Sequence, residues 1–424
     1  MKRVMKLIKW GFIIGISYFV LTTLYFGYDD IDSEKGIFKF YWSGLQGLRK
    51  DSKFGFGFKF NEVVQTKLNG VDGPYVFGDI VFNVNKNNVF HSSIIDNSRS
   101  IKVNTSCKEL PYFNVVLNNK VIIEKDNYEN PSKLIAISDI EGNFTGFYSF
   151  LFANKVIDKN ANWIFGNGHL VLNGDFFDRG TQVPQVLWLI YHLENQSLIQ
   201  GGKVHFILGN HEIMNLYGDV SYNDYKYMEV SKRVSKQNDW DKGLRYLYSE
   251  KSELGKWLRS KNIVEKIGEN IFVHGGLNKL HSDGKYSINE LNTISKKYYG
   301  IYPTEESIKD KRDKLLISSI DSPFWDRRLN FDLKYKVMFK LNGVDASETT
   351  DKELATILSF YNSKRIIIGH SVVDDISAGY NNKVIKIDVK HGQKMGTGKT
   401  KGLFIEKNVF YKVNDLGIKE KLFI

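Results

Sequence analysis

The amino-acid sequence predicts a protein of the α/β class. From residue 131 onward, short apolar segments with strand character alternate with polar loops and amphipathic helical segments, a pattern typical of strands joined by helices. Polar motifs follow directly after these strands, where α/β proteins build their ligand sites. With 424 residues and 42% hydrophobic content, the chain is long and apolar enough to bury a sizeable core.

The elements of this α/β part follow a regular order. Helices are predicted near residues 143–154 and 183–193, after the first and second strands. Charged helical stretches after the third strand, and again between about residues 287 and 361, are expected to be insertions that cap the site. The fourth strand is followed directly by His274, and the fifth by Gly369 and then His370. The predicted strands comprise residues 134–138, 170–173, 204–208, 271–273 and 365–368.

The N-terminal segment, residues 1–30, is predicted to direct the protein to a membrane. Residues 1–10 contain four basic side chains, and residues 11–28 contain no charged side chain. This apolar run is close to the ~20 residues that a membrane-spanning helix needs. Acidic residues follow it, where a cleaved signal peptide would have small residues.

Three interpretations of this segment remain open: an uncleaved signal anchor, which we favour, a cleaved signal peptide, and a buried helix. The basic flank predicts that the rest of the chain lies on the extracytoplasmic, periplasmic side of the membrane. It would be anchored there, or secreted into that space after cleavage. A membrane partner is therefore expected through residues 1–30.

Residues 31–130 form a predicted β-rich lead-in region, which precedes a catalytic domain of residues 131–424. Short alternating segments, such as residues 75–77, 80–84 and 114–117, are separated by Asn-Gly, Asp-Gly and Asn-Asn pairs that favour turns. The region offers no catalytic constellation, so its expected role is structural.

The chain has a formal net charge of +11 and a pI near 9.2. Its basic residues are spread along the chain and mixed with acidic ones, so no nucleic-acid partner is expected. The surplus of positive charge favours capture of an anionic substrate. Cys107 is the only cysteine, which excludes an intrachain disulfide and a thiolate metal site, and it is interpreted as an incidental thiol.

Five short motifs stand at the ends of the five predicted strands. They combine carboxylates, amides and imidazoles, an oxygen and nitrogen ligand set that suits Mn, Fe, Zn or Mg. Neighbouring glycines allow the backbone to turn sharply, so that the side chains can converge. The motifs are Asp139-Ile140-Glu141-Gly142-Asn143, Gly174-Asp175-Phe176-Phe177-Asp178-Arg179-Gly180, Gly209-Asn210-His211-Glu212, His274-Gly275-Gly276 and Gly369-His370-Ser371.

The order and spacing of these motifs resemble the calcineurin-like metallophosphoesterase superfamily, in particular its phosphoprotein-phosphatase branch. GDxxDRG, GNHE and HGG in succession are jointly very specific, and the resemblance extends over about residues 134–388. Within that branch, the motifs resemble those of the bacterial Shewanella-like phosphatases. The resemblance implies a metallophosphoesterase-type β-sandwich flanked by helices. It also implies a phosphatase with two divalent metal ions, for which Mn is favoured and Fe, Zn or Mg are alternatives.

The resemblance also implies a role for individual residues in metal binding. In the family, a hydroxide that bridges the two cations attacks phosphorus in line. The implied ligands are Asp139 and Glu141 for the first metal, Asp175 as the bridge, Asn210 and His274 for the second metal, and His370 for one of the two.

Further residues are implied to bind the phosphate and to protonate the leaving group. Arg179 would grip two phosphate oxygens, and His211, oriented by Asp178, would be the general acid. A second phosphate arginine is usual in this branch. Residues 322–328 resemble its Trp-x-Arg element, which points to Arg327, with Arg328 directly adjacent.

Glu141 departs from the family pattern, which has histidine at this position. A glutamate can bind a metal through oxygen, and it would favour harder cations such as Mn or Mg. The alternative is that Glu141 only forms hydrogen bonds in its loop, which would leave the first metal weakly bound or absent. We favour metal binding, because every other predicted ligand matches the pattern.

The sequence thus predicts a membrane-anchored phosphomonoesterase that acts on a phosphorylated protein or small molecule. Phosphotyrosine is a candidate by analogy with the bacterial group. One alternative is a hydrolase of nucleotides, phosphodiesters or pyrophosphates. Another is a catalytically impaired, metal-binding sensor of phosphorylated ligands, which Glu141 motivates.

Four other histidines are given no part in the ligand set. His169, His192 and His205 are interpreted as packing or surface residues, and His391 as at most a neighbour of the site. Residues 396–400 superficially resemble a nucleotide-binding loop. They are interpreted as a basic turn, because Gln393 stands where that loop needs glycine.

Overall fold

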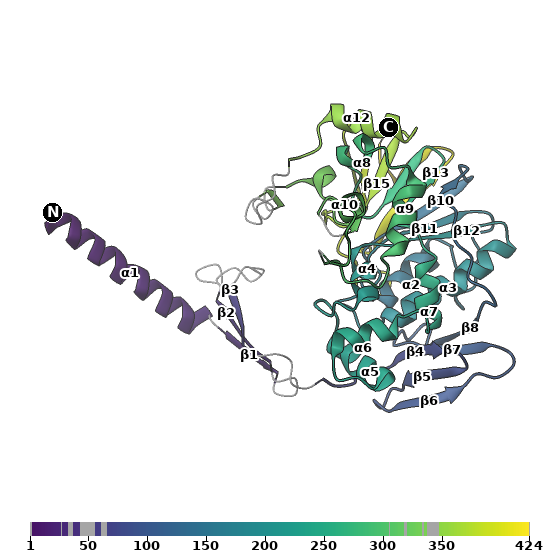
Figure 1. Ribbon diagram of the computed structural model, residues 1–424, viewed down its shortest axis with the longest axis horizontal. Coiled ribbons are helices and arrows are strands. Elements are labelled where there is room, and N and C mark those ends of the chain that lie inside the picture. Colours follow the sequence, from purple (N-terminus) through teal and green to yellow (C-terminus); the bar gives the residue numbers. More distant parts are fainter. Residues whose placement is uncertain are drawn as a thin grey trace. The chain divides into compact units, whose positions relative to one another are not determined.

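The computed structural model describes residues 2–26, 28–32, 37–42, 56–60, 66–304, 306–317, 320–332, 335–336 and 347–423 (Figure 1). The chain divides into two compact units, residues 1–67 and residues 68–424. The first carries the candidate membrane segment, and the second carries all five motifs.

The first unit contains one long helix and three antiparallel strands. Helix α1 (Lys2–Phe26) includes a stretch of 22 residues, Val4–Tyr25, with a mean hydropathy of 1.7. This stretch is long and apolar enough for a membrane anchor or a signal sequence. The strands are β1 (Tyr28–Asp32), β2 (Ile37–Trp42) and β3 (Phe56–Phe60), in the order β1-β2-β3.

The centre of the second unit consists of two six-stranded sheets. In the first sheet, β10, β11 and β12 are parallel, and in the second sheet β14, β15 and β17 are parallel. The first sheet has the order β12 (Lys203–Ile207), β11 (His169–Asn173), β10 (Lys133–Ile137), β18 (Lys401–Glu406), β19 (Val409–Asn414) and β20 (Lys419–Lys421). The second has the order β16 (Ser377–Gly379), β17 (Val384–Lys386), β15 (Arg365–Ile368), β14 (Asn270–Val273), β13 (Val264–Ile267) and β9 (Asn127–Tyr128).

Side chains alternate between two apolar clusters along these strands. Leu134 and Ala136 of β10 share one cluster with Phe272 and Ile367 of the second sheet, so the two sheets pack on each other. Ile135 and Ile137, which point to the opposite face, belong to the cluster that includes the helices. The mixed α/β class predicted from the sequence is confirmed.

Helices cover the sheets and connect the strands. Helix α2 (Phe144–Ala153) begins after Asn143, whose side chain accepts a hydrogen bond from the backbone N–H of Gly146 (3.0 Å) and so caps the helix. Helix α3 (Val183–Ile199) starts with Pro184 in its first turn, where proline is favourable. Both follow their strands as predicted.

The two predicted insertions contain most of the remaining helices. Between β12 and β13 the chain forms α4 (Asn210–Tyr217), α5 (Tyr225–Ser235), α6 (Trp240–Leu247) and α7 (Glu253–Arg259). Between β14 and β15 it forms α8 (Lys279–Asp283), α9 (Ile288–Lys297), α10 (Lys311–Ile317), the 3-10 helix η2 (Arg328–Asn330) and α12 (Asp351–Phe360).

The predicted β-rich region contributes six short described strands to the second unit. One of them, β9, joins the second six-stranded sheet. The other five form a three-stranded sheet and a two-stranded hairpin: β4 (Asp72–Phe77), β5 (Ile80–Val84) and β6 (Phe90–Ile94), then β7 (Ser100–Asn104) and β8 (Tyr112–Val116). Lys226 of α5 is buried against this region and donates a hydrogen bond to the Val71 carbonyl (3.1 Å). Residues 33–36, 43–55 and 61–65 of the predicted region lie outside the described residues.

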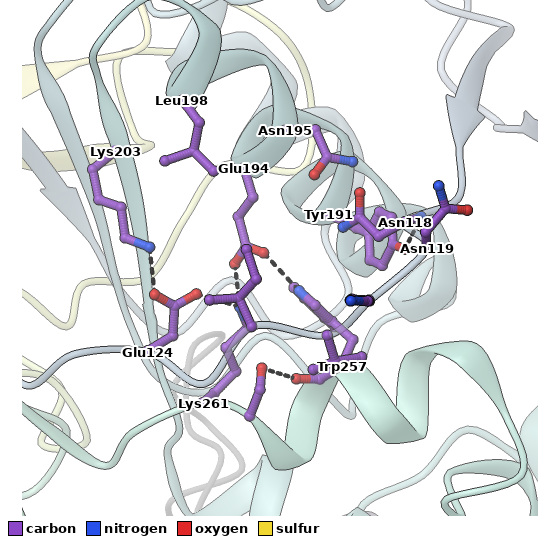
Figure 2. A pocket seen from close by; sticks show the side chains of 14 residues that line it. Asn118, Asn119, Glu124, Tyr191, Glu194, Asn195, Leu198, Lys203, Trp257 and Lys261 are labelled. Atoms are coloured by element: carbon purple, nitrogen blue, oxygen red, sulfur yellow. Dashed lines mark hydrogen bonds and ion pairs between the residues drawn. The ribbon is translucent and has the colours of Figure 1, made fainter.

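A buried ion network also attaches the end of this region to the catalytic part. Figure 2 shows it at the wall of a cavity of about 240 Å³. The Lys261 ammonium lies 3.0 Å from a Glu124 carboxylate oxygen and 2.7 Å from one of Glu194, and Lys203 also pairs with Glu124. Burial alone would raise the pKa of Glu124, but Lys261 and Lys203 outweigh it and lower this pKa to about 2.

Replacing Lys261 with Met is expected to destabilise the protein by ~3–5 kcal/mol, because it leaves buried carboxylates without their shared cation. Thermal unfolding of the full chain measures this loss. Lys256→Met is the matched control, since Lys256 lies on the exposed face of neighbouring helix α7 and should leave the unfolding temperature nearly unchanged. Equal unfolding temperatures for the two variants would contradict a stabilising role for the network.

Candidate metal centre and active site

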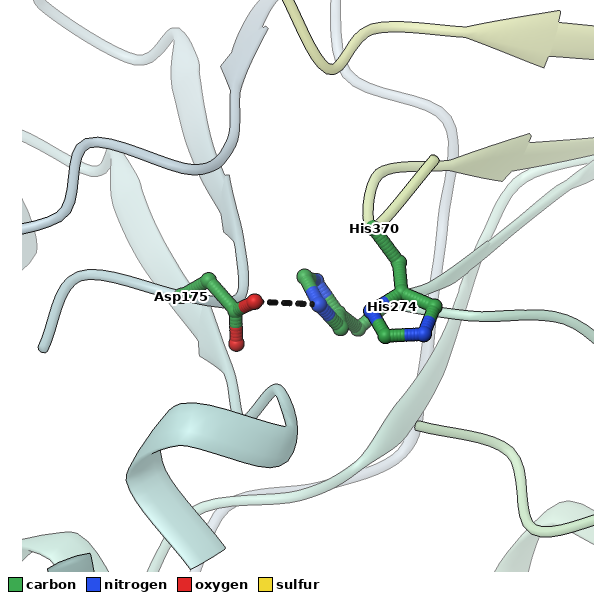
Figure 3. Close-up of side chains that lie close together, drawn as sticks. All are labelled: Asp175, His274 and His370. Carbon is green, nitrogen blue, oxygen red and sulfur yellow. Dashed lines mark ion pairs between the residues drawn. The ribbon is translucent and has the colours of Figure 1, made fainter. Parts of the chain in front are cut away.

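The five motifs lie at the carboxyl ends of β10, β11, β12, β14 and β15. These strands are parallel within each sheet, so their carboxyl ends share an edge, and the two sheets pack on each other. The structure brings three predicted ligands into one buried group, Asp175, His274 and His370. One potential ligand atom from each lies within 4.8 Å of the others (Figure 3).

The contact between His274 and Asp175 needs a cation. His274 donates its Nδ1–H to the Asn173 carbonyl (2.8 Å), which leaves the Nε2 lone pair 2.9 Å from a carboxylate oxygen of Asp175. When the His274 ring is neutral, its Nε2 and the Asp175 oxygen are both acceptors, so they repel each other. Burial lowers the pKa of His274, but the Asp175 carboxylate outweighs burial and raises it. A proton or a metal ion would relieve this repulsion.

Two further buried ligand atoms have no hydrogen-bond partner within the described residues. They are Nε2 of His370 and the side-chain oxygen of Asn210. Burial and the nearby cationic Arg327 keep the pKa of His370 well below its usual value, so the ring is neutral and its lone pair is free to bind a metal. Orphaned buried acceptors of this kind fit a divalent cation held by oxygen and nitrogen ligands.

Asp139 lies beside this group, close to a carboxylate that the sequence analysis missed. One Asp139 oxygen accepts the backbone N–H of His370 (3.3 Å). Burial, then the charges of Asp388 and Asp175, hold the pKa of Asp139 well above its usual value. Asp388 is buried, and burial raises its pKa to about 6. It could have been found, because it too follows an apolar strand, β17.

The structure places Glu141 outside the group of Asp175, His274 and His370. Its carboxylate pairs with the guanidinium of Arg179, and the two loops are joined by a hydrogen bond from the Gly180 N–H to the Glu141 carbonyl (2.9 Å). The predicted ligand of the first metal therefore contacts the predicted phosphate arginine.

Replacing Glu141 with Gln tests the prediction that the Glu141 carboxylate binds a metal ion. We expect Mn²⁺ to bind at least about tenfold more weakly, because a neutral amide is a poorer ligand for a hard cation than a carboxylate. Calorimetric titration of the full chain with Mn²⁺ measures the affinity. Glu250→Gln is the control, since the Glu250 side chain is 82% exposed. If Glu141→Gln binds Mn²⁺ as tightly as the unmodified chain, Glu141 is no ligand.

His211 and Asp178 form a buried pair next to the metal-binding group. The Nδ1 of His211 lies 2.5 Å from Asp178, while its Nε2 faces Asp175 at 3.7 Å. Asn215 and Asn223 both donate to the other Asp178 oxygen, at 2.9 and 2.7 Å. Burial lowers the pKa of His211, but the Asp175 and Asp178 carboxylates outweigh it and raise this pKa to about 9. The ring is thus oriented and protonated near neutral pH.

Glu212, the last residue of GNHE, organises the loops around Asp175. Its buried carboxylate accepts the backbone N–H groups of Asp175 (2.9 Å), Phe176 (2.7 Å) and Gly209 (2.7 Å). Glu212 belongs to the predicted GNHE motif, but the motif alone does not indicate this role. The Phe177 N–H also donates to the Glu212 carboxylate (3.3 Å), so four backbone donors on one buried carboxylate tie the second motif to the third.

The two adjacent arginines of residues 322–328 have different surroundings. Arg327 donates to the carbonyl of His370 (2.7 Å) and to the hydroxyl of Tyr335 (2.8 Å). Arg328 forms ion pairs with Asp326 and Asp321. The structure therefore places Arg327 against His370, a predicted metal ligand, whereas Arg328 pairs with acidic residues of its own loop.

Six predicted site residues have a backbone in the left-handed region, which side chains other than glycine rarely adopt. They turn the chain sharply in the loops after β10, β11 and β15. They are Asp139 (φ 55°), Glu141 (φ 48°), Asp175 (φ 61°), Asp178 (φ 69°), Arg179 (φ 54°) and His370 (φ 63°).

The remaining histidines lie apart from this group. The Nδ1 of His205 is 2.7 Å from Glu265, and its Nε2 is 3.0 Å from the Nδ1 of His169, in a buried packing arrangement. His391 donates to the carbonyl of Ser138 (2.8 Å), directly before Asp139, so it supports the first motif.

The thiol of Cys107 is buried, and burial raises its pKa.

The sequence profile of the calcineurin-like phosphoesterase family matches residues 132–374, more than half of the chain. The chain belongs to this family. Calcineurin-like phosphoesterases are hydrolases of phosphoric esters, and the matched region contains all five motifs at the strand ends described above.

Relatives within the family are named as phosphatases. Shewanella-like protein phosphatase 1 of Plasmodium berghei is 31% identical over 246 residues, which cover 58% of this chain and 63% of that protein. The chain thus spans less than two thirds of that relative. Shewanella-like protein phosphatase 2 of Arabidopsis thaliana is 24% identical, with 63% of this chain and 73% of that protein covered.

A solved structure is similar over most of the chain. The cold-active protein-tyrosine phosphatase of a psychrophilic Shewanella species has a TM-score of 0.71 and 28% identity, and the match covers 84% of this chain and 100% of that one. The predicted resemblance to metallophosphoesterases of the Shewanella-like group is confirmed, and so is the metallophosphoesterase type of α/β fold.

Proposed function

We propose that the protein is a metal-dependent phosphomonoesterase. The observation that carries the proposal is the position of the Asp178-His211 pair: its free imidazole nitrogen faces Asp175 beside the orphaned acceptors of His274 and His370. A proton donor next to a cation site is the arrangement needed to cleave a phosphate ester with release of an alcohol or phenol.

Asp175, His274 and His370 form one group that could hold a metal ion, and we propose that the whole set holds two divalent cations, with Mn favoured. Asp139 and Glu141 would hold the first, Asp175 would bridge, and Asn210, His274 and His370 complete the predicted set. When bound, the cations neutralise phosphate charge and lower the pKa of an attacking water. The preference for Mn rests on the carboxylates in this set.

The chain's own residues would bind the phosphate and protonate the leaving group. The Arg179 side chain is 51% exposed, so a phosphate can reach its guanidinium once the pairing with Glu141 is replaced. His211, held by Asp178, would donate its Nε2 proton to the leaving oxygen. Arg327 would orient His370 through its carbonyl and add positive charge near the phosphate.

The proposed substrate is a phosphoprotein, phosphotyrosine included, because the similar Shewanella enzyme is named a protein-tyrosine phosphatase. We further propose that α1 anchors the protein in a membrane, with the catalytic domain on the extracytoplasmic side. The length and apolar character of Val4–Tyr25, and the basic residues before Gly11, support this placement.

The experiment that tests the proposal compares metal content and turnover of the full chain in detergent. Chain loaded with Mn, Mg, Zn or Fe is assayed on 4-nitrophenyl phosphate and on bis(4-nitrophenyl) phosphate. We expect metal-dependent release of 4-nitrophenol, faster from the monoester than from the diester. Faster turnover of the diester would favour the alternative of a phosphodiester or nucleotide hydrolase.

A second candidate function is that of a metal-binding sensor of phosphorylated ligands. The ion pair between Glu141 and Arg179 favours it, because it occupies the guanidinium that a phosphate substrate would need. A sensor would bind phosphate but release no product with any of the four metals. Turnover that is lost in Asp175→Asn would reject this candidate.

A further inference from the structure

Tyr222 occupies an unexpected place beside the site, on the loop between α4 and α5. The loop is fixed to two predicted site residues. The Tyr222 carbonyl accepts the backbone N–H of Arg179 (3.0 Å), and the side chain of the next residue, Asn223, donates to Asp178 (2.7 Å). Tyr222 therefore has a defined position relative to the proposed general acid and the phosphate arginine.

The ring of Tyr222 contacts both of these groups. Its centroid lies 5.0 Å from that of His211, with the planes at 70°, and 5.7 Å from the guanidinium carbon of Arg179. In a phosphate ester, the oxygen that His211 protonates connects the phosphorus to the leaving group. A leaving group attached to that oxygen would lie near His211, and the Tyr222 ring borders both His211 and Arg179.

Much of this ring is accessible. Tyr222 is 46% exposed, although it contacts two residues of the site. Within the part of the chain that the structure describes, no residue hydrogen-bonds its hydroxyl group. A tyrosine that is buried for packing usually has a hydrogen-bond partner for its hydroxyl group. An exposed aromatic surface at this place is suited to contact an aromatic ring of a ligand.

We infer that Tyr222 determines specificity for the leaving group, by stacking on aryl groups, so that the site prefers aryl phosphate monoesters to alkyl ones. The inference rests on the proposed function for the location of the leaving group. Offset or edge-to-face contact between two aromatic rings is favourable beyond the area that it buries. An alkyl group offers no such contact, so the preference depends on the ring of Tyr222 and much less on its hydroxyl.

Binding of two non-hydrolysable ligands tests the inference without turnover. Phenylphosphonate and methylphosphonate carry the same charged group and differ in the attached group. We expect the Mn²⁺-loaded full chain to bind phenylphosphonate about three- to tenfold more tightly, as measured by calorimetry. Tyr222→Ala should remove most of this preference, and Tyr222→Phe should keep it.

Two variants separate stacking from other effects. Tyr222→Leu keeps an apolar side chain of similar length, so a preference equal to that of the unmodified chain would overturn stacking. Tyr302→Ala is the matched control, because Tyr302 is 50% exposed and its ring packs edge-on against Tyr217, not against His211 or Arg179. It should leave the preference unchanged.

Two peptides that differ only in phosphotyrosine or phosphoserine extend the test to catalysis. The ratio of their kcat/KM values should fall about three- to tenfold in Tyr222→Ala. Equal losses for both peptides and both phosphonates would show that Tyr222 only supports the Arg179 loop, and would overturn the inference. The inference would also be overturned if the unmodified chain bound phenylphosphonate and methylphosphonate equally tightly. A chain that prefers phenylphosphonate but hydrolyses nothing would refute the proposed function alone.

Discussion

Replacing Asp175 with Asn is expected to lower kcat by at least about a thousandfold and to reduce the metal content of the protein. Asp175 is the predicted bridge between the two cations, and its carboxylate already lies 2.9 Å from the His274 Nε2. An amide has one oxygen and no negative charge, so it cannot hold two cations. Elemental analysis of the purified chain, together with turnover of 4-nitrophenyl phosphate, measures both effects.

The fold should tolerate this substitution. In the unmodified chain, the backbone N–H of His211 donates to an Asp175 oxygen (3.0 Å). The side-chain oxygen of Asn can accept this hydrogen bond, and its NH2 group can donate to the Nε2 lone pair of His274. The unfolding temperature should therefore change little. Asp374→Asn is the control, since Asp374 is exposed and only a few residues beyond His370. Normal metal content and turnover in Asp175→Asn would refute the bridging role.

Replacing His211 with Asn is expected to have an effect that depends on the leaving group. General acid catalysis contributes typically 10²–10⁴-fold, and it matters most when the leaving oxygen is strongly basic. Hydrolysis of phenyl phosphate should therefore fall by about this factor, whereas hydrolysis of 2,4-dinitrophenyl phosphate should change much less. A plot of log kcat against the pKa of the leaving group should become steeper in the variant.

Asp178→Asn gives an independent check of the same role. Asp178 raises the pKa of His211 and accepts its Nδ1–H, so the variant should show the same dependence on the leaving group, with a smaller loss. Asn215 and Asn223 can still donate to the new amide oxygen, which preserves the loop. Losses that are equal for good and poor leaving groups in both variants would exclude a proton-donating role for His211.

The α/β class and the placement of the five motifs could be predicted because they depend on local patterns. Each motif directly follows an apolar strand, so its position in the fold follows from the position of the strand. The same rule would have marked Asp388, which follows β17, as a candidate site residue, but it does not predict the approach of Asp388 to Asp139. It depends on the pairing of β17 with β15, which is set by long-range contacts between distant segments.

Two other features of the site also depend on contacts between loops. The pairing of Glu141 with Arg179 arises because the backbone N–H of Glu141 bonds to the Asp175 carbonyl (3.0 Å), which joins the first two motifs. Tyr222 lies in a loop without periodic pattern, so no sequence signal pointed to it. The roles predicted for individual ligands remain predictions, which the substitutions above test.

The left-handed backbone at six site residues has a consequence for the evolution of this protein. Each of these conformations costs about 1–3 kcal/mol for a residue other than glycine, so the site is maintained at the expense of global stability. Selection for heat resistance alone should therefore favour glycine at positions such as Arg179, and would remove the phosphate-binding side chain with it. Thermostable variants need to be screened for turnover as well as for folding.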